Sequence, residues 1–141
     1  MIVFLDTSSL VKLYIAEEGS DNVRSAVESY VEIAVSSVAY VEMYSALSRR
    51  VREGSIGPRE IKKISVAFEA DWLRFGKVPM DDSLLHRAGK ICLDRSVRAL
   101  DAIQLATALV VSENQEEPLI FLTSDKRLES AARLEKLRTQ I

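Results

Sequence analysis

Short apolar runs that alternate with helical stretches are the feature that most constrains the fold of this chain. Three runs are predicted to be buried strands, at 2–5 (IVFL), 33–36 (IAVS) and 119–124 (LIFLTS). Two weaker candidates lie at 77–80 (KVPM) and 138–141 (RTQI). Continuous apolar strands separated by helices are typical of a parallel sheet that is covered on both faces. The sequence therefore predicts an α/β fold of three layers with a doubly wound sheet.

The segments between these runs have helical periodicity and recognisable ends. Capping residues begin several of them, Gly19 and Gly54 end two, and Pro58 suits a first helical turn. We expect helices at 6–19, 20–32, 37–54, 58–75, 81–95, 97–110 and 125–137. No linker, internal repeat or low-complexity segment interrupts this order, so residues 1–141 are expected to form a single domain.

Composition places the chain among ordinary globular proteins. Of its 141 residues, 48% are hydrophobic and 28% are charged, and a chain of this length holds a core without cross-links. Cys92 is the only cysteine, which rules out an internal disulfide and suits a reducing compartment. The N-terminal stretch has no basic segment, and no run approaches 18 apolar residues. We therefore expect a soluble, cytoplasmic protein without a membrane span.

Charge is unevenly distributed along the chain, although the net charge is only −2. Residues 49–63 hold six basic residues against two acidic ones. One interpretation of this stretch is a solvated helix end followed by a turn. The other is a local contact for phosphate groups. The residues available for such a contact with RNA are Arg49, Arg50, Arg52, Lys62 and Lys63.

Two aspartates directly follow predicted strands. Asp6 comes after the strand at 2–5, and Asp125 comes after the strand at 119–124. Ligands of an open parallel sheet bind at the carboxyl ends of its strands, which is where both side chains would lie. Each aspartate is also compatible with a simpler role as a helix N-cap. The residues alone leave both interpretations open.

Two further acids lie within predicted helices. The neighbours of Glu42 one turn away are small or apolar, so Glu42 is either paired or metal-bound near the core or turned to solvent beside Arg49. Asp101 begins the most apolar helix of the chain, on a face that continues through Leu105. It is either a cap or a ligand, and the helix dipole favours its ionised form in both cases.

Four acids without matching bases would repel one another in a shared site. Hard divalent cations resolve such repulsion, because Mg²⁺ and Mn²⁺ prefer carboxylate oxygens and leave positions for water and phosphate oxygens. Such a site suits hydrolysis of phosphodiesters. Other chemistries have little support. One cysteine and His86 cannot form a zinc site, and the five glycines are too scattered for a phosphate-binding loop.

Four motifs, in order along the chain, resemble the acidic motifs of PIN-domain nucleases. They are FLDTSSLVKLY, SSVAYVEMYSAL, RALDAIQLATAL and FLTSDKRLESAA. The resemblance runs from Ile2 to about Leu137 and is strongest to the VapC-type toxins of toxin–antitoxin pairs. A single motif of this kind is weak support, whereas four in the right order and context are specific.

The resemblance implies a Rossmann-like α/β/α domain with a parallel sheet of four to five strands in the order 3-2-1-4-5. It also implies an acidic pocket for Mg²⁺ or Mn²⁺ and metal-dependent cleavage of RNA. Thr7 and Thr123 match hydroxyl positions that support the acids. The residues that match the catalytic and metal-binding acids are Asp6, Glu42, Asp101 and Asp125.

The resemblance further implies a homodimer and inhibition by a small antitoxin protein. Six apolar residues are candidates for such an interface, with core packing as the alternative: Leu13, Tyr14, Ile15, Ile64, Phe68 and Trp72. Two other functions remain open. One is a PIN-domain nuclease that processes RNA outside a toxin–antitoxin pair. The other is a receiver-like Mg²⁺-binding signalling module, which would need a late lysine that is not evident.

Overall fold

The centre of the protein is a parallel sheet, seen here in a computed structural model that describes residues 1–30 and 32–139. Its strands are β1 (Ile2–Leu5), β2 (Glu32–Val35) and β3 (Leu119–Leu122), in the order β2-β1-β3. Ile2 pairs with Glu32 on one side and with Leu119 on the other, so the three strands begin at the same edge. The predicted α/β class with a parallel sheet is confirmed.

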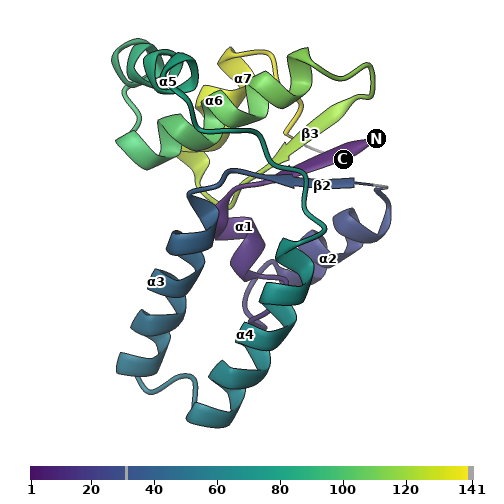
Figure 1. Ribbon diagram of the computed structural model, residues 1–141, viewed down its shortest axis with the longest axis vertical. Coiled ribbons are helices and arrows are strands. Elements are labelled where there is room, and N and C mark those ends of the chain that lie inside the picture. The colour runs from purple at the N-terminus through teal and green to yellow at the C-terminus, as the bar shows by residue number, and fades with distance from the viewer. Residues whose placement is uncertain (31, 140–141) are drawn as a thin grey trace.

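Helices cover both faces of the sheet (Figure 1). One layer contains α1 (Thr7–Val11), α2 (Ser20–Glu28), α3 (Ala39–Arg52) and α4 (Pro58–Trp72). The other contains α5 (Asp82–Arg95), α6 (Ala99–Glu113) and α7 (Lys126–Leu134). In Figure 1, α3 and α4 extend away from the sheet as a hairpin, and α5 packs along α6.

Alternate side chains of β1 enter two separate cores. Ile2 and Phe4 pack in the core beneath α5, α6 and α7, whereas Val3 and Leu5 pack in the core beneath α1 to α4. Because both faces of the strand are buried, its sequence is continuously apolar and does not alternate with polar residues. Burial on both faces fixes the position of β1, and with it the place where the chain emerges at Asp6.

Two of the five predicted strands do not form as strands in the described part of the chain. The run at 77–80 is replaced by one bridge at Gly76, which exchanges hydrogen bonds with Ile33 (2.8 Å) and Val35 (2.9 Å) on β2. Pro79 has no N–H to extend this pairing. The bridges keep the predicted order of chain segments, with Gly76 outside β2.

The predicted strand at 138–141 is likewise reduced to one bridge. The carbonyl of Arg138 accepts a hydrogen bond from Phe121 N (2.8 Å), beside β3. Residues 140–141 of this prediction lie outside the described residues. The prediction of four to five strands is therefore corrected to three strands and two single bridges over residues 1–30 and 32–139.

The other helices end within a few residues of their predicted bounds, but the prediction of one helix over 6–19 is wrong. The helix α1 ends at Val11. A serine side chain competes with helical bonding after it, since Ser20 Oγ donates to Ile15 O and accepts from Glu17 N, both at 3.0 Å. Across the described ranges, no helix is long and apolar enough to cross a membrane.

Candidate active site

Asp6 lies where β1 ends and α1 begins, and it is almost completely buried at 4% exposure. Its Oδ1 caps α1 by accepting a hydrogen bond from Ser9 N (2.9 Å). Ser8 Oγ donates to the same carboxylate (2.7 Å), and Thr123 Oγ1 donates to Oδ2 (2.5 Å). The cap interpretation therefore holds locally, but a cap alone does not need two additional hydroxyl donors.

Burial raises the pKa of Asp6 to about 6. The hydrogen bonds from Thr123, Ser8 and Ser9 oppose this rise because they stabilise the ionised carboxylate. The negative charge of Asp101 acts in the same direction as burial. A second acid therefore lies close enough to Asp6 to influence its ionisation.

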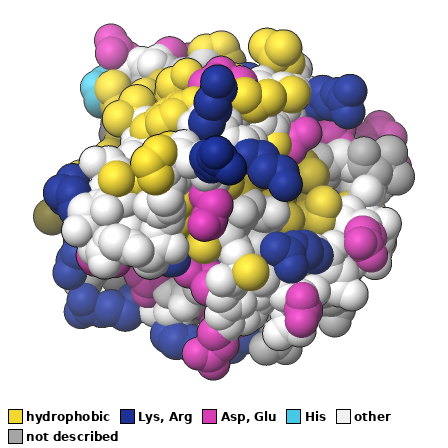
Figure 2. Space-filling view, turned by 90° about the horizontal axis from the view of Figure 1, so that it is seen from below, with side chains coloured by type: hydrophobic (Ala, Val, Ile, Leu, Met, Phe, Trp, Pro, Cys, Tyr) yellow, Lys and Arg dark blue, Asp and Glu magenta, His cyan; other side chains and the backbone are white. Residues whose placement is uncertain are grey.

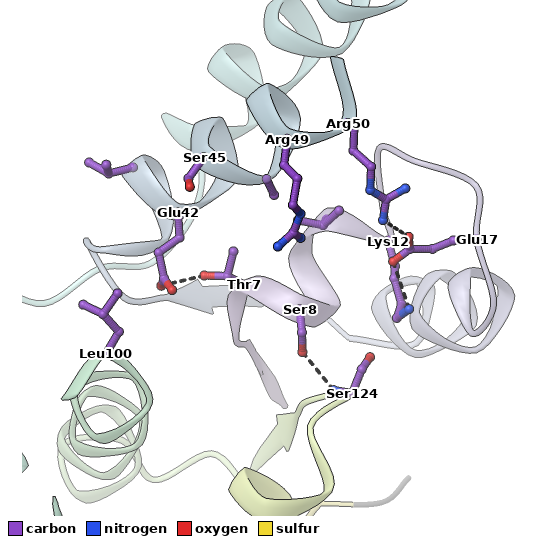
Figure 3. A pocket seen from close by; sticks show the side chains of 13 residues that line it. Thr7, Ser8, Lys12, Glu17, Glu42, Ser45, Arg49, Arg50, Leu100 and Ser124 are labelled. Atoms are coloured by element: carbon purple, nitrogen blue, oxygen red, sulfur yellow. Dashed lines mark hydrogen bonds and ion pairs between the residues drawn. The ribbon is translucent and has the colours of Figure 1, made fainter. Parts of the chain in front are cut away.

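Glu42 points inward from α3, which decides against the solvent-facing alternative. Its Oε1 accepts hydrogen bonds from Thr7 Oγ1 (2.8 Å) and from Gln104 Nε2 (2.9 Å). Figure 3 shows the contact with Thr7 at the edge of a pocket. Glu42 is therefore held by residues of α1 and α6, two elements that are distant from it in the sequence.

Asp101 lies in the first turn of α6 but does not cap it, because Arg98 occupies the N-cap position. Burial raises the pKa of Asp101, and the charges of Asp125 and Glu42 raise it further, while Arg98 opposes them. With the link between Asp101 and Asp6, the four acids form one electrostatically coupled group. The cap interpretation of Asp101 is thus excluded.

Asp125 follows β3 and is the N-cap of α7. Its Oδ1 accepts from Arg127 N (2.8 Å) and Leu128 N (3.2 Å), and its own N–H donates to Thr123 Oγ1 (3.0 Å). Because Thr123 also donates to Asp6, its hydroxyl connects these two acids. The resemblance implies that the hydroxyls of Thr7 and Thr123 support the acids, and each hydroxyl forms a hydrogen bond with one acid.

Two residues of this network were not singled out from the sequence. Gln104 bonds both Glu42 and Thr7, and Ser8 Oγ bonds Asp6 and accepts from Ser124 N (3.0 Å). The available signal for Gln104 was a polar residue on the apolar α6, one turn after an acid. Ser8 is one of two adjacent serines, which are common in the first turn of any helix, so its sequence context does not indicate a role in a site.

A pocket of about 540 Å³ opens between α1 and α3, and Glu42 is the one of the four acids that lines it. Figure 3 shows Arg49 reaching from α3 toward α1, between Glu42 and the ion pair of Arg50 with Glu17. Lys12, which also lines the pocket, pairs with Glu17 at 3.0 Å. The salt bridges found among the described residues do not include Arg49.

Two of the five basic residues suggested for RNA binding line this pocket. Arg49 and Arg50 line the pocket, whereas Arg52 donates to Ser48 Oγ (3.0 Å) at the end of α3. Lys62 and Lys63 are exposed on α4. Viewed from below in Figure 2, lysine and arginine side chains form separate groups among acidic ones, while hydrophobic side chains gather toward the top.

The donor atoms at this edge of the sheet fit a hard divalent cation in chemical kind. All four acids offer carboxylate oxygens, and their mutual repulsion is of the kind that a cation relieves. Within 1–30 and 32–139, however, no three potential ligands converge closely enough to hold a metal ion as they stand. Oδ1 of Asp6 and Oδ1 of Asp125 each accept a hydrogen bond from an N–H group of the helix that the residue caps.

Comparison with known proteins identifies the family. The model of the PIN domain matches residues 3–134, and the chain belongs to the PIN-domain family. Ribonuclease VapC45 of Mycobacterium tuberculosis is 30% identical to it over 132 residues, which cover 93% of this chain and 89% of that protein. Membership of this family excludes the receiver-like alternative.

Two solved structures share the fold along most of the chain. A toxin–antitoxin complex from Klebsiella pneumoniae superposes with a TM-score of 0.62 at 17% identity, covering 87% of this chain and 86% of that one. VapBC-1 from nontypeable Haemophilus influenzae gives a TM-score of 0.64 at 16% identity, with coverage of 99% and 97%. At these identities the likeness establishes the fold alone.

Proposed function

We propose that this protein is a metal-dependent endoribonuclease that serves as the toxin of a toxin–antitoxin pair. The supporting observation is the coupling of Asp101 to Asp6, Glu42 and Asp125, which places four acids in one electrostatic environment. Carboxylates at the carboxyl end of a parallel sheet suit Mg²⁺ or Mn²⁺. The relative that is 30% identical is named a ribonuclease.

In the proposed reaction, the residues that would hold the cation are Asp6, Glu42, Asp101 and Asp125. A cation held there would supply a bound water of lowered pKa and would offset negative charge on the phosphate. The hydroxyls of Ser8 and Thr123 orient the carboxylate of Asp6, and the hydroxyl of Thr7 orients that of Glu42. The attacking group would be water, and no covalent enzyme intermediate would form.

The pocket that Glu42 lines supports RNA as the substrate class. Arg49 is exposed and lines this pocket together with Glu42 and Ser8. A guanidinium without a carboxylate partner is suited to bind phosphate oxygens. Arg49 is therefore the residue of the 49–63 stretch that we assign to the backbone of an RNA strand near the cleavage position.

We assign the antitoxin to the surface between α4 and the segment that follows α1. Leu13, Tyr14 and Ile64 are partly buried and line adjoining pockets there, whereas Ile15 and Phe68 are core residues. Partly covered apolar side chains in a groove are typical of a protein interface. A homodimer, which we also propose, should persist when this groove is altered. Sedimentation of the chain alone and with its antitoxin separates the two associations.

RNA cleavage in Mg²⁺ or Mn²⁺ tests the proposed activity. We expect cleavage to stop in excess chelator and to fall by about 100-fold or more in Asp101→Asn, since the loss of one ligand weakens metal binding. Asp82→Asn is a matched control, because Asp82 is an exposed acid in the first turn of α5. Undiminished cleavage in chelator or by Asp101→Asn would contradict the proposal.

The toxin role needs a separate measurement. Expression of the wild type without its antitoxin should arrest growth and create new RNA ends, detectable by end sequencing, and Asp6→Asn should do neither. Normal growth together with trimming of one precursor RNA would instead favour a nuclease of RNA processing.

A further inference from the structure

Gln104 is a buried amide in the most apolar helix of the protein. Only 2% of the residue is exposed, and it lies one turn after Asp101 on α6. Its Nε2 donates one hydrogen bond to Glu42 Oε1 (2.9 Å) and another to Thr7 Oγ1 (3.0 Å). Thr7 donates to the same oxygen of Glu42 (2.8 Å). Residues from α1, α3 and α6 therefore meet at a single carboxylate oxygen.

The carbonyl oxygen of this amide lacks a hydrogen-bond donor among the described residues. Gln104 Oε1 is buried and has no hydrogen-bond partner within residues 1–30 and 32–139. A buried acceptor without a partner lowers the stability of the fold. An unbranched apolar side chain of similar length, such as methionine, would fill the same space without that penalty. Stability of the core alone therefore does not account for an amide at this position.

Thr107 provides a comparison one turn further along α6. It is also 2% exposed, but its Oγ1 donates to Ile103 O of the same helix (2.7 Å). Its polar group is thus satisfied locally and touches no acid. Gln104 differs because its donors reach across to two other elements and end at Glu42 and at the threonine that bonds Glu42.

We propose that Gln104 is a positioning residue that fixes the carboxylate of Glu42; the inference rests on the proposed nuclease function. With Thr7, it commits Oε1 of Glu42 to the protein, which leaves Oε2 for a divalent cation or its bound water. A glutamate side chain that is ordered before binding loses less conformational entropy on binding than a free one. Gln104 therefore acts through Glu42 and does not itself touch the reacting atoms.

The test compares two variants of Gln104 with Thr107→Val as the matched control. Gln104→Met keeps the length and removes the hydrogen bonds, and Gln104→Glu places a second carboxyl group against Glu42. Thr107→Val removes a polar group of similar burial from the same helix. The measurements are Mn²⁺ affinity by calorimetric titration, kcat and KM with an RNA substrate, and Tm without metal.

For Gln104→Met we expect Mn²⁺ affinity and kcat each to fall by about tenfold, the lower end of the range for loss of a hydrogen bond that supports a metal ligand. The KM for RNA should be little changed. The Tm without metal should stay the same or rise, because the unsatisfied acceptor disappears. Gln104→Glu should lower Mn²⁺ affinity and kcat further than Gln104→Met does. Thr107→Val should keep wild-type Mn²⁺ affinity and kcat.

Several results would overturn the proposal. Wild-type Mn²⁺ affinity in Gln104→Met excludes a positioning role, as does a lowered Tm combined with wild-type kcat. A wild type that binds no Mn²⁺ overturns both this inference and the proposed function. A wild type that binds Mn²⁺ without cleaving RNA refutes the nuclease alone, and tenfold weaker binding by Gln104→Met then still supports positioning.

A second pair of variants decides the case if Gln104→Met does not fold. Thr7→Ser keeps the hydroxyl that donates to Glu42, whereas Thr7→Val removes it with little change in shape. We expect Thr7→Ser to retain Mn²⁺ affinity and Thr7→Val to lose about tenfold. Equal affinity in the two variants would overturn the assignment of this network to the orientation of Glu42.

Discussion

Individual carboxylates in this protein take part in local structure and in the candidate site at the same time. Asp6 caps α1 through Ser9 N and also accepts hydrogen bonds from Ser8 and Thr123. Asparagine caps a helix about as well as aspartate, so capping alone does not require a charge. The ionised side chain is buried at a cost, since burial raises the pKa of Asp6 to about 6. A buried charge at this position is what the proposed ligand role of Asp6 requires.

Asp6→Asn should change how stability depends on pH. The pKa of Asp6 in the folded state, about 6, lies above its ordinary value of 3.8, so the folded state binds the proton more tightly. The contribution of Asp6 to wild-type stability should therefore be fully present below about pH 4 and be lost as pH rises through 6, by on the order of 3 kcal/mol at most. Without metal, Asp6→Asn should be more stable than the wild type at neutral pH and nearly equal near pH 4.

The measurement is thermal unfolding by circular dichroism at several pH values, in chelator. Asp21→Asn is the control, because Asp21 is fully exposed in the first turn of α2 and its pairing with Arg24 contributes little. If the stability advantage of Asp6→Asn did not depend on pH, burial of the charge would not be its cause.

Single helices decide which side chains share a surface. On α3, Glu42 and Arg49 are seven residues apart, about two turns, so both line the same pocket. On the side of α3 that faces away from this pocket, Tyr40 and Tyr44 contact α4. Both hydroxyls donate hydrogen bonds to Oε1 of Glu69, at 2.6 Å and 2.5 Å. The helix α3 thus connects the candidate site to the packing of α4.

Arg49→Ala should weaken RNA binding and reduce its dependence on salt. Each phosphate contact with a single strand contributes about 0.7 to the slope of log affinity against log salt concentration. We expect the slope to fall by about that amount, measured by fluorescence anisotropy in a cleavage-deficient Asp101→Asn background. Arg52→Ala, in the same helical turn but bonded to Ser48, should leave the slope unchanged. A change of equal size in both variants would indicate a general charge effect.

Glu69→Gln should make the tyrosines of the hairpin ionise at lower pH. The hydrogen bond to Glu69 is the largest influence that raises the pKa of Tyr44 to about 12. Replacement of the carboxylate by an amide removes the charge that opposes tyrosinate, so this pKa should move toward its ordinary range. An ultraviolet absorbance titration follows the change, with Tyr44→Phe to identify the step. An unchanged titration would show that the carboxylate does not bond these hydroxyls in solution.

The whole molecule brings together acids that are far apart in the chain. Asp6 follows β1, Glu42 lies on α3, Asp101 lies in the first turn of α6 and Asp125 follows β3. The parallel sheet places the ends of β1 and β3 side by side, and the two cores hold α3 and α6 against opposite faces. The coupled group of acids therefore exists only in the folded state.

Mn²⁺ should stabilise the folded wild type, since the unfolded chain has no such group of acids. At a concentration about 100 times the Kd, binding to the native state alone adds about 2.7 kcal/mol. The Tm should rise with Mn²⁺ concentration in the wild type and much less in Asp101→Asn, followed by scanning calorimetry. Equal increases in the two proteins would mean that the ion binds elsewhere.

The order of elements and the α/β class could be predicted from local sequence. Continuous apolar runs, capping residues and helical periodicity depend on neighbours within a few positions, so they are readable before folding. The same holds for the four acidic motifs, whose order predicted the family that the comparison confirmed. Local patterns were insufficient at 77–80 and 138–139, where strand formation depends on an edge that the rest of the sheet provides.

The state of each site residue depends on partners that are distant in the sequence. Glu42 is held by Thr7, 35 positions away, and by Gln104, 62 positions away, and Gln104 reaches Thr7 across 97 positions. Arg50 is paired with Glu17, 33 positions away, whereas the salt bridges found among the described residues do not include Arg49. Sequence periodicity specifies the face of a helix, but the side chain that it meets there is specified only when the two cores pack against the sheet.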